Sequence, residues 1–424
     1  MFHVVVFGAG KSSNYFLKLL CNDPSIEKIT VIDKNITTRK ISSKINYIQV
    51  SINNKDHIIP HIEKSNLVVS LLPAQLHIEI AKICVQKDKN LVTASYVSPE
   101  MEILAESFKA KNLVCINEMG LDPGIDHITA CALLEELKHK GAIITDFASH
   151  TGGIIANPQK GKWNYKFSWN PMNVINAGKE GAITLEEATP KTTTYQTLFK
   201  TAKRIQIGDN TYESYANRDS LKYLKKYGLN NIKNLYRGTL RHEGFCKAWD
   251  FLIQIGLTDT SKKLYFPPDT SLKKFFDSFK KGIQPNAEII EKLEEIGWLS
   301  EDHISKNEGT AGELLQNILI EGSWKLSAKD RDLVVMLHEI TYELDGKRYK
   351  YTRSMEVTGQ NSYYTAMAKT VGIPLFETVK MLLNKEINLT GVLIPTQKEL
   401  FQPLLEKLAK HELIFNDEIH EINL

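Results

Sequence analysis

Several features are missing from this 424-residue sequence, and each absence narrows the possible functions. The five cysteines form no Cys-X-X-Cys pair, and four lie in apolar patterns, which indicates buried thiols in a reducing compartment. No apolar run approaches the ~18 residues of a membrane-spanning helix, and no basic segment typical of a signal peptide is seen. The 53 basic and 50 acidic residues nearly balance, which disfavours nucleic-acid binding. Histidines lack partners at ligand spacing. We therefore expect a cytoplasmic protein without a metal, membrane or nucleic-acid partner.

What is present is an alternation of short apolar runs and helix patterns in the first part of the chain. The apolar runs predict strands at residues 2–10, 28–33, 46–51, 67–73, 90–96 and 113–116. Strands that alternate with helices are typical of a Rossmann-type, doubly wound parallel α/β sheet. The length predicts two or three domains.

The first predicted strand ends in a glycine loop that is suited to a dinucleotide. Gly8 allows a tight turn, and Gly10 lets a pyrophosphate approach the backbone at the start of the next helix. Ser12 and Ser13 are expected to cap that helix, although Ser13 stands where the dinucleotide-binding motif has Gly or Ala. The alternative is an ordinary strand–helix turn, but the position of the loop after the first strand favours dinucleotide binding.

The end of the second predicted strand bears on the choice of cofactor. Asp33 can accept a hydrogen bond from the adenosine ribose 2′-OH, and the same carboxylate would repel a 2′-phosphate. This favours NAD over NADP. Lys34 and Arg39 lie nearby and could bind a phosphate, so NADP stays open.

The stretch from Asn117 to Ala130 follows the sixth predicted strand and combines acids, glycines, a proline and a histidine. A strand that turns through such a cluster into a helix lies where parallel sheets place their chemistry. Asp122 is the first candidate for a catalytic group. Tyr96 ends the fifth strand and faces the same edge, whereas His77 is expected to be structural.

The second part of the chain reads differently. Residues 141–153 predict a strand that ends in a loop. Residues 235–245 form a short polar segment, and Arg237, Thr239 and Arg241 share one face if it is a strand, although arginines near polar loops are usually solvated charges. Residues 246–326 are helical and charged. Residues 332–344 and 346–357 predict a hairpin at Asp-Gly, and the tail could return to the first domain.

Six motifs occur in the order of one known family: SYVSPE, NEMGLDPGIDH, YKFSW, ANRDS, YRGTLR and AKDRDLVVMLHE. In this order the chain closely resembles the L-glutamate-forming saccharopine dehydrogenases, also called saccharopine reductases. The resemblance implies a homodimer and three domains. These are a Rossmann domain at 1–125 completed by 386–424, a substrate-binding α/β domain at 126–245 and 329–385, and a helical insertion at 246–328.

The resemblance also implies a reaction and a site. The family oxidises saccharopine with NAD or NADP to L-glutamate and 2-aminoadipate 6-semialdehyde, or runs the reverse condensation. Asp122 and Tyr96 match its catalytic groups. The implied substrate-binding residues are Ser95, Tyr96, Asp122, Arg218, Thr239, Leu240 and Arg241. The implied cofactor-binding residues are Gly8, Ala9, Gly10, Lys11, Ser12, Asp33, Val50, Ser51, Leu72, Ala94, Ser95, Leu121, Asp122, Pro123 and Asn170.

One departure from the family pattern keeps alternatives open. Thr151 stands where the family has a cysteine near the active site, in a loop whose sequence differs over residues 150–157. Any proton role of that cysteine is lost or moves elsewhere, for example to His150. A relative acting on another secondary amine, such as a carboxylated polyamine, and a non-enzymatic nucleotide-binding scaffold are the competing hypotheses.

Overall fold

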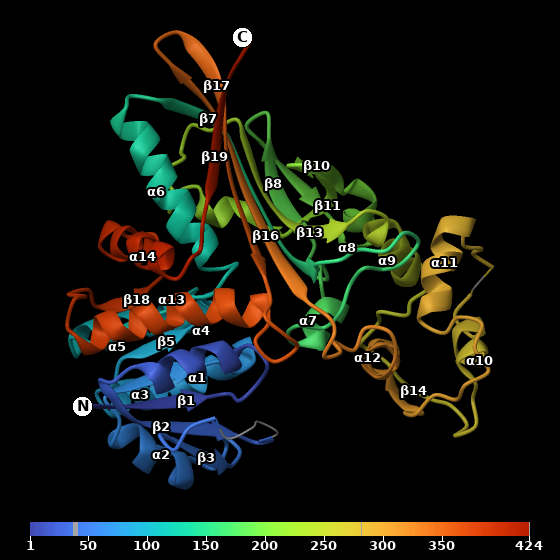
Figure 1. The fold of residues 1–424 in the computed structure, drawn as a ribbon, viewed down its shortest axis with the longest axis horizontal. Helices are drawn as coiled ribbons and strands as arrows, with labels where there is room; N and C mark the ends of the chain where they lie inside the picture. The colour runs from blue at the N-terminus through green and yellow to red at the C-terminus, as the bar shows by residue number, and fades with distance from the viewer. Residues whose placement is uncertain (37–40, 281, 424) are drawn as a thin grey trace. The chain divides into compact units, whose positions relative to one another are not determined.

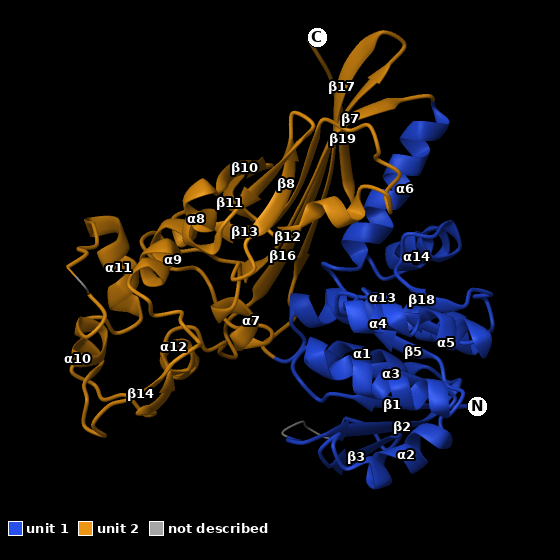
Figure 2. Ribbon diagram, turned by 180° about the vertical axis from the view of Figure 1, so that it is seen from behind, with its two compact units in different colours: residues 1–140, 363–414 blue, residues 141–362, 415–424 orange. Residues whose placement is uncertain are grey.

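The computed structural model describes residues 1–36, 41–280 and 282–423, and they form two compact units (Figure 2). Unit 1 comprises residues 1–140 and 363–414, and unit 2 comprises residues 141–362 and 415–424. Arg39 lies outside the described residues.

Unit 1 is built on a parallel sheet, which has seven strands within the described residues in the order β18-β6-β5-β4-β1-β2-β3. The strands are β1 (Phe2–Phe7), β2 (Ile26–Asp33), β3 (Ile45–Gln49), β4 (Leu67–Ser70), β5 (Leu91–Thr93), β6 (Val114–Ile116) and β18 (Gly391–Leu393). All six strands predicted in this region are present, and β18 pairs with β6, so the tail does return to the first sheet. The predicted doubly wound parallel sheet is confirmed.

Helices flank this sheet and connect its strands. They are α1 (Ser13–Asn22), α2 (Lys55–Glu63), α3 (His77–Gln86), α4 (Pro99–Ile103), α5 (Ala105–Ala110), α6 (Ile125–His139), α13 (Ala366–Leu383) and α14 (Lys398–Lys410). Figure 1 shows the orange-red helix α13 beside the blue helix α1, although they lie far apart in sequence. Gly372 permits this approach, because a Cβ there would stand 2.7 Å from the backbone N of Phe16.

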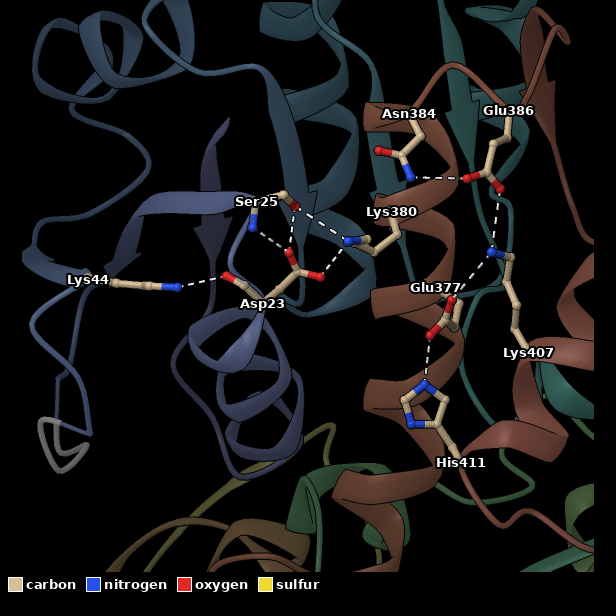
Figure 3. A network of polar contacts seen from close by, with 9 residues as sticks. All are labelled: Asp23, Ser25, Lys44, Glu377, Lys380, Asn384, Glu386, Lys407 and His411. Atoms are coloured by element: carbon tan, nitrogen blue, oxygen red, sulfur yellow. Dashed lines mark hydrogen bonds and ion pairs between the residues drawn. The ribbon is translucent and has the colours of Figure 1, made fainter. Parts of the chain in front are cut away.

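A polar network joins the C-terminal helices to the N-terminal part of unit 1 (Figure 3). Lys380 of α13 places its Nζ 2.5 Å from Oδ2 of Asp23, which follows α1. Burial by itself raises the pKa of Asp23, but hydrogen bonds from Lys380 and Ser25 hold it below the ordinary value. On the other side of α13, Glu377 accepts a hydrogen bond from His411 at 2.6 Å. The residues that Lys380 contacts lie up to 357 positions away in sequence, so these contacts form only when the fold is complete.

Unit 2 is built on a mixed sheet, which has ten strands within the described residues. Its main path runs β10-β11-β13-β7-β16-β17-β19, and β8, β9 and β12 lie off this path. The strands are β7 (Ile143–Ile155), β8 (Ala182–Glu186), β9 (Thr189–Thr193), β10 (Lys203–Ile207), β11 (Asn210–Ala216), β12 (Arg218–Asp219), β13 (Asn234–His242), β16 (Asp332–Leu344), β17 (Lys347–Thr358) and β19 (Asn416–Ile422). The predicted hairpin joins β16 and β17 through Asp345 and Gly346, both with positive φ.

The remaining α-helices and strands of unit 2 lie outside this sheet. They are α7 (Pro171–Ile175), α8 (Tyr195–Leu198), α9 (Phe245–Gln254), β14 (Lys263–Tyr265), α10 (Leu272–Asp277), α11 (Ala287–Glu295), β15 (Glu308–Thr310) and α12 (Ala311–Glu321). The predicted helical insertion therefore also contains a two-stranded sheet of β14 and β15. The core is strongly aromatic, with the buried rings of Trp163, Phe245, Trp249 and Trp324 in mutual contact.

The unit boundaries differ in four places from the domains expected from the sequence. Helix α6 and helix α13 both belong to unit 1, because α6 packs against α14 and α13 packs against α1. The residues after 414 leave unit 1 and form β19, which pairs with β17 in unit 2. The charged residues 246–328 lie within unit 2 rather than forming a unit of their own.

Candidate active site

The glycine loop of unit 1 has the geometry that a dinucleotide requires. Gly8 has a φ of +102°, and a Cβ there would come within 2.7 Å of the carbonyl oxygen of Leu71. A Cβ on Gly10, by contrast, would meet no atom within 4 Å, so the backbone there borders open space. The loop leads into α1, whose N-terminal N–H groups can bind a pyrophosphate. The residues present therefore fit the nicotinamide cofactor that the glycine loop implies.

Asp33 lies at the end of β2, as predicted, and its carboxylate is held in place. Its Oδ2 accepts a hydrogen bond from Ala9 N–H at 2.8 Å, and its Oδ1 accepts one from Asn35 N–H at 2.9 Å. Asp33 therefore joins the glycine loop to the end of the second strand, the usual position for a ribose-binding acid.

Most predicted cofactor-binding residues follow the carboxyl ends of these parallel strands. Lys11 and Ser12 precede α1, Val50 and Ser51 follow β3, Leu72 follows β4, Ala94 follows β5, and Leu121 and Pro123 follow β6. Since parallel strands end at one edge of a sheet, these predicted residues lie together at that edge. The expected capping role of Ser12 is wrong: it occupies the N-cap position with helical backbone angles, and its side chain makes no capping hydrogen bond. Ser13 instead donates to the carbonyl of Gly10 at 2.7 Å.

Tyr96 and Asp122 meet directly at this edge. The Tyr96 hydroxyl donates a hydrogen bond to Asp122 Oδ1 at 2.8 Å, and both side chains are half-buried. The loop that carries Asp122 folds tightly on itself, because Gly120 N–H donates to Pro123 O at 2.9 Å. Gly124 is required for this turn, since a Cβ there would lie 2.0 Å from the carbonyl oxygen of Gly120. The edge of the sheet therefore carries a partly exposed phenol that is hydrogen-bonded to a carboxylate.

His77 contacts Ser95, the residue before Tyr96, in a network of neutral polar groups. It is 3% exposed, and its Nδ1 and Nε2 lie 2.8 Å from Ser70 Oγ and 2.7 Å from Ser95 Oγ. Thr93 Oγ1 is 3.1 Å from the same Nε2. Burial lowers the pKa of His77 to about 4, so the ring is neutral near pH 7. The expected structural role fits this position, in which His77 bridges the ends of β4 and β5.

In unit 2, Arg241 lies in an aromatic box. Its guanidinium carbon is 5.0 Å from the ring centre of Tyr165, 5.2 Å from Phe245 and 5.6 Å from Tyr215. Its amino groups donate to Leu240 O at 2.9 Å and to Tyr215 Oη at 3.2 Å. No acidic side chain appears among these contacts, so the charge is oriented by rings and neutral oxygens. Such a guanidinium suits a ligand carboxylate.

The register of unit 2 decides which predicted residues share a face with Arg241. Residues 234–242 form strand β13, and Thr239 is aligned with Thr151 of β7, so these two side chains lie on the face of Arg241. The side chain of Leu240 points to the other face, where it packs with Ile154 and Val335. Any contact of Leu240 with a ligand on the Arg241 face would therefore come from its backbone.

The remaining predicted residues of unit 2 differ in their surroundings. Arg218 has a φ of +55°, is half exposed and forms an ion pair with Glu180 at 2.8 Å. Arg237 is buried, with its guanidinium carbon 4.4 Å from the ring centre of Tyr223. Asn170 caps α7 through a hydrogen bond from Met172 N–H at 3.1 Å, and it is the one predicted cofactor-binding residue in unit 2.

The suggestion that His150 could replace the family cysteine is wrong. Adjacent residues of a strand point to opposite faces, so His150 points away from Thr151 and from the face of Arg241. Its Nδ1 lies 2.8 Å from Ser214 Oγ, and its Nε2 lies 3.4 Å from Glu339 Oε2. Burial raises the pKa of Glu339, but His150 and Lys350 outweigh burial and bring it to about 2. His150 is therefore a buried structural residue.

Three features of the candidate site were not predicted from the sequence. They are the aromatic box of Arg241, the bridging contacts of His77, and a buried pair of Glu118 and His127 behind Asp122. The last two could have been predicted in part, because His77 and Glu118 lie close to predicted strand ends. The aromatic box draws on distant segments and leaves no local signal.

Comparison with known families accounts for both units. Residues 4–116 match the saccharopine dehydrogenase NADP binding domain, and residues 120–414 match the saccharopine dehydrogenase C-terminal domain. The chain belongs to the saccharopine dehydrogenase family. The predicted family is thereby confirmed.

Individual relatives agree with this membership. The mitochondrial alpha-aminoadipic semialdehyde synthase of Rattus norvegicus is 29% identical over 443 residues, covering 97% of this chain and 47% of the relative. The chain thus spans about half the length of that relative. The NADP(+)-dependent, L-glutamate-forming saccharopine dehydrogenase of Pyricularia oryzae is 30% identical, with 96% of each chain covered. The apo saccharopine dehydrogenase of Saccharomyces cerevisiae shares the fold, with a TM-score of 0.87 at 24% identity, over 99% of this chain and all of the other.

Within the described residues, no helix is both long and apolar enough to span a membrane.

Proposed function

We propose that the protein is a saccharopine dehydrogenase of the L-glutamate-forming type, an oxidoreductase of lysine metabolism. It oxidises the carbon–nitrogen bond on the lysine side of saccharopine, and water splits the resulting imine into L-glutamate and 2-aminoadipate 6-semialdehyde. The reverse reaction is a reductive condensation. The observation that carries the proposal is the hydrogen-bonded pair of Tyr96 and Asp122 at the edge of a dinucleotide-binding sheet. Family membership and the named activity of the fungal relative support it.

The chain's own residues take distinct roles in this reaction. Asp122 accepts and returns protons at the substrate nitrogen and at the attacking water, and the Tyr96 hydroxyl orients its carboxylate. Arg241 and Arg218 bind carboxylates of the substrate, and Thr239 and Ser95 supply further hydrogen-bonding groups. A nicotinamide cofactor held at the glycine loop and Asp33 would supply the group that takes up the hydride.

For the cofactor, we propose NAD in preference to NADP. The carboxylate of Asp33 is held at the end of β2 by two backbone N–H groups, so a 2′-phosphate would meet a fixed negative charge. The description of the matching family domain and the name of the Pyricularia relative favour NADP instead. The ratio of kcat/KM for the two cofactors decides between them.

Two further expectations accompany this assignment. The resemblance implies a homodimer, which light scattering after size-exclusion chromatography tests. The five cysteines are all free, which favours a reducing compartment such as the cytoplasm.

A second candidate substrate class rests on one observation. Thr151 lies on the same face as Arg241 and Thr239 and replaces the family cysteine with a group that barely titrates. A changed residue at this place favours a related secondary amine, such as a carboxylated polyamine.

The experiment follows absorbance at 340 nm with saccharopine and either cofactor, and then with other secondary amines. Turnover of saccharopine is the expected result. Turnover of another secondary amine alone would move the assignment to the second class. Absence of cofactor binding in a thermal-shift assay would contradict both and favour a non-enzymatic scaffold.

A further inference from the structure

We propose that Glu118 is a positioning residue that sets the geometry of the Tyr96–Asp122 pair; this inference rests on the proposed function. Glu118 begins the turn that follows β6, and Tyr96 lies in the turn that follows β5. The two turns come from neighbouring parallel strands. Glu118 is the residue that joins them on both sides of Tyr96.

The contacts of Glu118 bracket Tyr96 in the chain. The backbone N–H of Glu118 donates to Ser95 O at 3.0 Å, one residue before Tyr96. The side-chain Oε1 of Glu118 accepts from Val97 N–H at 3.1 Å, one residue after Tyr96. Both peptide groups that flank Tyr96 are therefore held by one residue, which restricts the direction in which the phenol ring can point.

The backbone of Glu118 is adapted to this double contact. Its φ is +57°, in the left-handed region that side chains other than glycine rarely adopt. In this conformation the N–H and the side chain of the same residue reach the same neighbouring turn. Such a conformation persists only where the surroundings enforce it, and it is common at functional sites.

A second set of contacts holds the carboxylate of Glu118 from behind. Its Oε2 accepts a hydrogen bond from His127 Nε2–H at 2.8 Å, and both side chains are at most 3% exposed. His127 Nδ1 lies 3.6 Å from Asp126 Oδ2, and Asp126 Oδ1 accepts from Gly124 N–H at 2.6 Å. Gly124 closes the turn that carries Asp122. The buried group of Glu118, His127 and Asp126 therefore contacts both the turn that carries Tyr96 and the turn that carries Asp122.

Burial separates the role of Glu118 from that of Asp122. Glu118 is 2% exposed, whereas Asp122 and Tyr96 are half-buried. A substrate that contacts Tyr96 and Asp122 therefore cannot reach the buried Glu118 carboxylate. Glu118 instead acts on the reaction through the position of Tyr96. For this role the side chain must be long enough to bond Val97 N–H and His127 together, and its negative charge is not needed.

Two substitutions of Glu118 separate the effect of side-chain length from the effect of the negative charge. Glu118→Gln keeps the length. Its amide oxygen can still accept from Val97 N–H, and its amide N–H can donate to His127 Nε2 when the ring carries its proton on Nδ1, which faces Asp126. Glu118→Asp keeps the carboxylate but is one methylene too short to bind Val97 N–H and His127 together. We expect Glu118→Gln to retain a kcat close to the unmodified enzyme, and Glu118→Asp to lower kcat by about 10²-fold, the cost of a displacement of roughly 1 Å. KM for the cofactor should stay unchanged in both.

A double-mutant cycle with Tyr96→Phe distinguishes positioning from a general structural effect. If Glu118 acts through the Tyr96 hydroxyl, Glu118→Asp should have little additional effect on kcat once that hydroxyl is gone. An equal loss in both backgrounds would overturn the proposal. So would an active Glu118→Asp combined with an inactive Glu118→Gln, because that order would assign the role to charge. Glu102→Asp, at an exposed site in α4, serves as the matched control.

A readout without turnover separates this inference from the proposed function. An unmodified enzyme that does not oxidise saccharopine contradicts the function alone. In that case a crystal structure of Glu118→Asp is the test, with retained melting temperature as the check on folding. A Tyr96 Oη displaced from Asp122 Oδ1 supports the positioning role, and a separation still at 2.8 Å overturns it.

Discussion

His77 makes the stability of unit 1 sensitive to pH in a way that can be calculated. Its pKa is about 4 in the folded protein, because burial disfavours the charged ring, and 6.5 is its ordinary value. Between these values the unfolded chain binds a proton that the folded chain does not. Stability therefore falls as the pH falls from about 6.5 towards 4, and below 4 this residue contributes no further loss.

The size of the effect follows from the difference between the two pKa values. The full shift corresponds to about 3 kcal/mol of unfolding free energy at 1.36 kcal/mol per pKa unit. Between pH 7 and pH 5, linkage gives a loss of about 2 kcal/mol from His77 alone. His77→Gln removes the titration while keeping a side chain that can hydrogen-bond Ser95. The variant should therefore lose about 2 kcal/mol less than the unmodified protein over this pH range.

The assay must report on unit 1. All five tryptophans lie in unit 2, so their fluorescence would miss the effect. Urea-dependent hydrogen exchange of peptides covering β4 and β5, followed by mass spectrometry, reports on the correct unit. The control is His57→Gln, at an exposed position of α2. Identical pH dependence in His77→Gln and in the unmodified protein would refute the assignment of His77 as a buried neutral group.

Three further predictions concern the site and the C-terminal helices. Asp122→Asn should lower kcat by about 10²-fold or more; an unchanged rate and pH profile would remove Asp122 from proton transfer. Asp33→Ser with Lys34→Arg should raise kcat/KM for NADP relative to NAD, and an unchanged ratio would mean that Asp33 does not contact the ribose. Lys380→Met should destabilise the protein by about 2 kcal/mol at pH 7, because Asp23 loses a charged partner. Since the pKa of Asp23 is depressed, this difference should decrease as the pH falls below the ordinary value of 3.8 and acid begins to protonate Asp23, which urea unfolding at pH 7 and pH 3 would measure.

Local patterns were sufficient for the elements that carry the site. Each predicted strand of unit 1 is present, because short apolar runs between turn residues have few other ways to be buried. The Asp345-Gly346 hairpin was predicted for a similar reason, since both residues tolerate positive φ. Asp33, Tyr96 and Asp122 were placed at strand ends by the same patterns, and the parallel sheet brings such ends together.

Contacts between segments that are distant in sequence could not be predicted from these local patterns. The boundary of unit 1 depends on α13 packing against α1, and Gly372 permits that contact without any sign of it in the neighbouring sequence. Strand β19 is short, charged and exposed, so it has no apolar alternation to predict it. It exists because β17 offers an unpaired edge.

The sequence by itself determined the family, the alternating strands and helices of the dinucleotide-binding unit, and the residue types at its strand ends. Those features depend on local composition and on short motifs. Only the tertiary structure decided that His150 points away from Thr151, that Arg241 lies among three rings, and that Glu118 holds the chain on both sides of Tyr96. These depend on strand register and on one left-handed residue, because a shift of one position in a strand moves every side chain to the opposite face.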